Sequence, residues 1–160
     1  MTEAEWLSCD DPTRMLLFLE QHGAGSARNL RLFACACCRR IVPADDEMYL
    51  AMIRRVEDFA RGQASEEELG EVAIKALDDL QSSGDPMCGA VFHAAHDGDE
   101  HEGAIAATNA AAEAADLSEP AERAAQAALV RSVFGNPFAG QERRQDAAPG
   151  TSSEGDAALT

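Results

Sequence analysis

Two pairs of residues in this chain have the type and the spacing of metal ligands. Cys35 and Cys38 form a C-x-x-C motif, and His93 and His96 form an H-x-x-H motif. Thiolate sulfur and imidazole nitrogen in a Cys₂His₂ set suit a tetrahedral zinc ion. These four residues are therefore the candidate metal ligands, and zinc is the candidate cofactor.

The thiols allow three interpretations. Cys35 lies one helical turn from both Arg31 and Arg39, and neighbouring cations favour a thiolate. Such a thiol would suit a zinc-binding or redox module, or the nucleophile of a cysteine-dependent enzyme with histidine as its base. In the third interpretation the thiols are buried as small core side chains and the arginines extend to solvent. The sequence favours this third interpretation and assigns no catalytic residue, since it has no glycine-rich phosphate loop, G-x-S-x-G or H-E-x-x-H motif.

The segment that carries three of the five cysteines is predicted to be the central helix. Ser26 is a suitable N-cap and Pro43 ends the segment, so the helix should run from Ala27 to Ile41. One stripe of it is apolar and further apolar residues cover most of its circumference, which favours burial on more than one side. The residues expected to reach water are Arg28, Arg31, Arg39 and Arg40.

The histidine pair falls on a later predicted helix, from Pro86 to about His96. Its core-facing stripe is formed by Met87, Ala90, Val91 and Ala94. His93 and His96 project from the opposite side of this helix, so both imidazoles are expected to face water.

The whole chain is predicted to be all-α. Alanine is abundant and β-branched and aromatic residues are sparse. Capping boxes at Thr2–Glu5 and Ser65–Glu68, and Asp-Pro starts at Asp11 and Asp85, mark further helix beginnings. We expect a compact bundle of six to seven helices over residues 1–138. Residues 139–160 have only one large aliphatic side chain and are expected to form a flexible acidic tail.

The net charge is −16 and is unevenly distributed. Residues 1–42 hold five acids and five bases, whereas residues 43–160 hold 24 acids and eight bases. Such acidity disfavours nucleic acid and anionic membranes as partners and favours solubility or a basic protein partner. Four bases are close enough in the sequence to form a local anion site, but we expect them to pair with neighbouring carboxylates instead: Arg39, Arg40, Arg54 and Arg55.

Cysteine usage and hydropathy predict a cytoplasmic protein. Five cysteines are an odd number, and three of them are crowded into four positions of one helix, which is not a disulfide framework. No apolar run reaches 18 residues, and the opening MTEAEWLSC is acidic, unlike a secretory signal.

Several stretches together resemble one family. They are the opening MTEAEWLSCDDPTRMLLFLE, the motif SARNLRLFACACCRRI, FARG at residues 59–62 and the closing VRSVFGNPF. The chain resembles, over about residues 1–138, a family of uncharacterised proteins found mainly in planctomycete bacteria. Val42 stands where the family often has tryptophan, and the segment that often follows GNPF is replaced by the expected tail. The resemblance implies homology and supplies no activity, cofactor or partner.

Absent catalytic motifs, strong acidity and the expected tail together favour one functional class. We expect a non-catalytic protein-interaction or regulatory module of the cytosol. Its expected partner is another protein, and the acidity favours a basic one.

Overall fold

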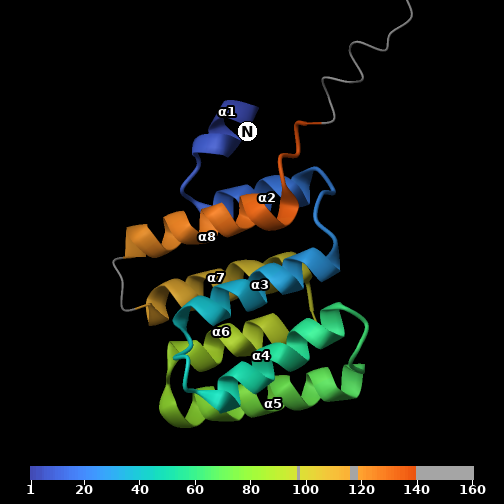
Figure 1. Ribbon diagram of the computed structural model, residues 1–160, viewed down its shortest axis with the longest axis vertical. Coiled ribbons are helices and arrows are strands. Elements are labelled where there is room, and N and C mark those ends of the chain that lie inside the picture. The colour runs from blue at the N-terminus through green and yellow to red at the C-terminus, as the bar shows by residue number, and fades with distance from the viewer. Residues whose placement is uncertain (97, 116–118, 140–160) are drawn as a thin grey trace, which may run out of the picture.

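The computed structural model describes residues 1–96, 98–115 and 119–139, and these ranges contain eight α-helices and no strand (Figure 1). The helices are α1 (Glu3–Ser8), α2 (Pro12–Gln21), α3 (Ala27–Ile41), α4 (Glu47–Ala60), α5 (Glu66–Ser83), α6 (Pro86–Ala95), α7 (Glu100–Ala114) and α8 (Glu119–Phe134). The prediction of a compact all-α bundle is confirmed. The described ranges contain one helix more than the upper limit of that prediction, because every helix beginning marked in the sequence, including the one at Thr2, starts a separate helix. The tail is predicted over residues 139–160. Apart from Ala139, these residues lie outside the described ranges.

Local capping explains where the helices begin. The Thr2 hydroxyl accepts the Glu5 N–H at 3.2 Å while the Glu5 carboxylate accepts the Thr2 N–H at 2.7 Å, which completes a capping box. Ser65 and Glu68 form the same arrangement at the start of α5. Ser26 caps α3, and the observed bounds of α3 are the predicted ones.

The central position of α3 is also as predicted. It contacts α4, α6, α7 and α8, and Figure 1 shows it in the middle of the stack of helices. Seven of its side chains are buried: Leu30, Arg31, Phe33, Ala34, Cys35, Cys37 and Cys38. A helix that is apolar around most of its circumference is stable only when neighbours cover several of its sides, and this one is so covered.

Small side chains bring α6 and α7 close together. Ala90 and Ala94 of α6 and Ala104 and Ala107 of α7 are buried. A Cβ atom on Gly103 would lie only 3.2 Å from the backbone oxygen of His93, so a larger residue there would push the two helices apart. This close packing fixes the position of the histidine-bearing end of α6.

The terminal helices form a layer on one side of α3 and α7. Figure 1 shows α2 and α8 side by side, with α1 above them, and α5 at the far end of the stack. Arg131 of α8 donates to the backbone oxygens of Trp6 and Cys9 at 3.2 and 2.8 Å, which ties α8 to the end of α1. None of the helices in the described ranges combines the length and hydropathy that crossing a membrane requires.

Candidate functional site

The candidate thiols lie in the core. Cys35 is 1% exposed and Cys38 is completely buried, and all five cysteines are free. Burial, with the nearby Glu57 carboxylate adding to it, raises the pKa of Cys35 to about 12. Burial likewise raises the pKa of Cys38 well above its ordinary value. The nearby arginines do favour the Cys35 thiolate, but desolvation outweighs the attraction of their charges. The burial of both thiols agrees with the favoured interpretation, in which they are small core side chains.

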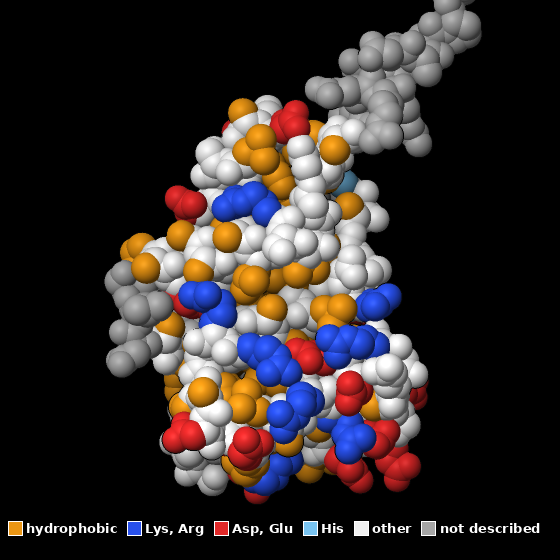
Figure 2. Space-filling model, viewed as in Figure 1, with side chains coloured by type: hydrophobic (Ala, Val, Ile, Leu, Met, Phe, Trp, Pro, Cys, Tyr) orange, Lys and Arg blue, Asp and Glu red, His pale blue; other side chains and the backbone are white. Residues whose placement is uncertain are grey.

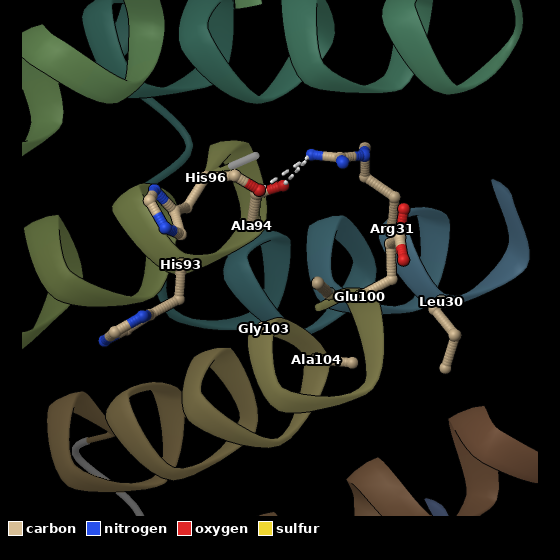
Figure 3. A pocket seen from close by; sticks show the side chains of 9 residues that line it. Leu30, Arg31, His93, Ala94, His96, Glu100, Gly103 and Ala104 are labelled. Atoms are coloured by element: carbon tan, nitrogen blue, oxygen red, sulfur yellow. Dashed lines mark hydrogen bonds between the residues drawn. The ribbon is translucent and has the colours of Figure 1, made fainter. Parts of the chain in front are cut away.

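Arg31 is buried, although the sequence pattern predicts it to be exposed. Its side chain crosses to the end of α6, where Nη1 donates to the backbone oxygens of Ala94 and His96 at 3.1 and 3.4 Å (Figure 3). The guanidinium also lies 5.1 Å from the centre of the Phe59 ring. The last carbonyls of a helix have no partner within the helix, so Arg31 stabilises the α6 end and joins it to α3.

The two candidate histidines lie at this same end of α6. Figure 3 shows both imidazoles pointing away from Arg31. His96 is exposed, as expected, with its ring 5.3 Å from that of Phe92, whereas His93 is half-buried. Burial, together with the nearby His96, lowers the pKa of His93. A neutral His93 at physiological pH follows.

The structure does not gather the four predicted ligands at one point. Cys35 and Cys38 lie inside the bundle on α3, and His93 and His96 lie at the surface end of α6. Across the described ranges, no three His, Cys, Asp or Glu side chains are placed to hold a metal ion. Zinc binding by these residues stays a prediction that would require the core to open.

The spaces around the histidines differ in size and chemistry. A cavity between Leu30, Arg31 and Ala104 has a volume of about 10 Å³, which is the size of one water. On the other side of His93 lies an open depression of about 390 Å³, which Asp99 and Glu102 border. Asp99 Oδ1 is occupied as the cap of α7, accepting the N–H groups of residues 101 and 102 at 2.9 and 3.1 Å. Neither space places a nucleophile beside a general base.

Comparison with known proteins adds no family to this description. No known protein family, curated protein or solved structure matches the chain. The resemblance to the planctomycete family therefore stays a prediction.

A third space adjoins His96 on the side of α5, and we call it the α5–α6 groove. It has a volume of about 280 Å³ and is lined by Glu66, Leu69, Gly70, Ala73, Ile74, Ala95 and His96. Ile74 is 72% exposed, more than the other exposed large hydrophobic side chains, Leu7, Leu17 and Met48. The sequence analysis missed this site. The available signal was that Ile74 lies outside the core-facing stripe of its helix, where a polar residue is usual.

The predicted pairing of the arginines is confirmed. Arg39 meets Glu57 at 2.6 Å, Arg40 meets Glu122 at 2.9 Å, Arg54 meets Glu47 at 3.5 Å, and Arg55 pairs with Glu68. Figure 2 shows Lys and Arg side chains crossing this face of the molecule, with acidic side chains beside several of them. Because carboxylates neutralise these four arginines, they do not form a free anion site among themselves.

Proposed function

We propose that the protein is a non-catalytic helical module that binds another protein. The observation that carries this proposal is the exposure of Ile74 in an apolar groove on an acidic surface. Isolated exposed aliphatic residues are common, but one that borders a groove with other apolar residues is typical of a contact surface.

The side chains whose types are most suited to catalysis are buried or paired within the fold, which supports a non-catalytic role. The thiols are buried, and burial raises the pKa of Cys35 and of Cys38. Arg31 caps a helix, and Arg40 pairs with the Glu122 carboxylate, whose side chain is 1% exposed. Five free cysteines suit the reducing conditions of the cytoplasm, which we propose as the location.

The acidity of α5 favours a basic partner. Glu71 and Asp78 are exposed on either side of Ile74, one turn away in each direction along the helix. Negative charge around an apolar contact raises the association rate of a positively charged protein and disfavours acidic ones.

The test is affinity capture from lysate with charge-reversed variants. The Glu71→Lys/Asp78→Lys double variant changes the charge beside Ile74, and Glu20→Lys/Glu113→Lys makes the same change at exposed positions of other helices. We expect wild type and the second variant to capture the same protein, and the first variant to lose it while its circular dichroism and melting temperature stay unchanged. If wild type captures no protein above the level of a mock resin, the proposed function is wrong.

A further inference from the structure

We propose that the α5–α6 groove binds one aliphatic side chain of a basic helical segment of the partner, with the segment lying across Gly70. This inference rests on the proposed function and specifies its site and the chemistry of its partner. Three independent features carry it: an unexplained glycine, the size and lining of the groove, and the charge of its rim.

Gly70 makes no contact with the described part of the chain that requires glycine. It lies inside α5, where glycine costs about 1 kcal/mol relative to alanine. It is not among the glycines with positive φ, and a Cβ atom placed on it would meet no atom within 4 Å. Gly103 differs, because a Cβ there would press on α6. The space above Gly70 is therefore open to a partner and lets its chain approach closely.

The groove has the size and lining of a site for a single side chain. Its volume of about 280 Å³ is below the range of about 300 to 1,000 Å³ that small-molecule sites occupy. Leu69 forms its buried floor, and Ala73, Ile74 and Ala95 supply further apolar surface. An inserted leucine or isoleucine of the partner would cover Ile74, which would remove the apolar surface of Ile74 and that of the inserted side chain from water.

The rim of the groove determines the charge of the partner. Glu66 lines the α5–α6 groove, and three further carboxylates of α5 are exposed within two turns of Ile74: Glu67, Glu71 and Asp78. Lys75, the one base on α5, is paired with Asp79. Lysines or arginines flanking the inserted side chain would meet these carboxylates, whereas an acidic segment or a phosphate would be repelled.

The test uses full-length protein and a synthetic amphipathic helix of leucine and lysine, about 14 residues or four turns long. Two control peptides replace leucine with serine or lysine with glutamate. Binding is followed by the Ile74 methyl resonance in NMR titrations at two salt concentrations. We expect the leucine–lysine peptide to shift this resonance and to bind more weakly at high salt, and neither control peptide to bind.

Gly70→Leu fills the α5–α6 groove with the side chain of a good helix former, so α5 should stay intact. Ala51→Leu adds the same side chain at an exposed position of α4 and serves as the matched control. We expect Gly70→Leu to weaken peptide binding by at least about tenfold and Ala51→Leu to leave it unchanged.

Four outcomes would overturn the inference. Equal peptide affinity for wild type and Gly70→Leu would show that the groove is not the site, and no binding of the leucine–lysine peptide would remove the partner chemistry. Reversible dimerisation of the free protein that Gly70→Leu abolishes would identify a second copy as the occupant. If Gly70→Leu still captures the partner found in lysate, the groove assignment fails while the interaction module stands.

Discussion

The central helix α3 and the outer helix α5 differ in how well their residue types indicate their roles. α3 holds the residue types that suggest chemistry, yet α4, α6, α7 and α8 enclose it and its cysteines are buried. α5 holds no cysteine or histidine, yet it packs mainly on α4 and α6 and leaves Ile74 exposed. Position in the bundle, more than residue type, therefore separates structural side chains from candidate binding side chains.

Polar groups follow the same division. On α3, Arg31 and Arg40 reach backbone oxygens or a buried carboxylate, so each of them joins two helices. On α5, the acidic side chains around Ile74 remain in water. Removing a polar side chain of α3 should therefore change the free energy of unfolding, whereas removing one on the outer side of α5 should change the affinity for a partner.

The largest expected effect concerns thiol reactivity. A pKa of about 12 in place of 9.0 lowers the thiolate fraction of Cys35 by three powers of ten, about a thousandfold, at neutral pH. We expect no cysteine of the folded protein to react promptly with DTNB, and all five to react in guanidinium chloride. Prompt labelling of even one α3 thiol would contradict the enclosure of α3 and revive the thiol-based alternatives.

The second prediction compares one large apolar side chain from each helix. Phe33 of α3 is completely buried and Ile74 of α5 is largely exposed. Phe33→Ala should lower the free energy of unfolding by about 3 to 5 kcal/mol, through lost burial and a cavity. Ile74→Ala should change it by less than about 0.5 kcal/mol. Urea denaturation measures both, and similar losses would mean that α5 is covered in the folded protein.

The third prediction compares two ion pairs. Arg40→Ala leaves the Glu122 carboxylate, whose side chain is 1% exposed, without its partner. Because the arginine itself is about one third exposed, we expect a loss of about 2 to 3 kcal/mol, below the range for a fully buried pair. Arg55→Ala breaks a pair that is exposed on both sides and should cost much less than Arg40→Ala. Equal losses in urea denaturation would show that the Glu122 site admits water.

The sequence predicts features that depend on nearby residues. Ser26 and Pro43 mark the ends of α3 because caps and prolines act within one turn. The pairing of the arginines on α3 and α4 was also predictable, because the surrounding chain is rich in carboxylates.

Features that depend on distant segments were not predictable. Arg31 is buried because it donates to the backbone oxygens of Ala94 and His96, which are 63 and 65 residues away in the sequence. No local pattern predicts that contact. The charge of Arg31 suggested that its side chain is exposed, and that expectation is wrong because of this one contact. The burial of Cys35, by contrast, is what the favoured interpretation of the thiols predicts. The exposure of Ile74 also depends on a distant segment, because it is set by how far α6 extends along α5.

The fourth prediction uses two helical glycines. Gly70→Ala should raise the free energy of unfolding by about 0.5 to 1 kcal/mol, because alanine favours the helix and meets no neighbour. Gly103→Ala should give no gain or a loss, because its Cβ would lie 3.2 Å from the backbone oxygen of His93. Thermal and urea unfolding of the pair would check both signs. A loss at Gly70 would show that its space is already filled in the folded protein.

The smallest expected effect concerns the acid limb of stability. The hydrogen bond from Arg39 of α3 lowers the pKa of Glu57 below its ordinary 4.5, with Arg61 adding to the attraction. A carboxyl group with a lowered folded pKa contributes stability that is present above pH 4.5 and is lost as the pH falls through the folded value. The stability difference between wild type and Glu57→Gln should therefore be constant near neutrality and shrink below pH 4.5. The effect is modest because Arg39 is partly exposed and salt screens the pair. A difference that stayed constant from pH 7 to pH 3 would mean that the Arg39 contact is not maintained in solution, and that α3 is less firmly joined to α4 than its buried residues indicate.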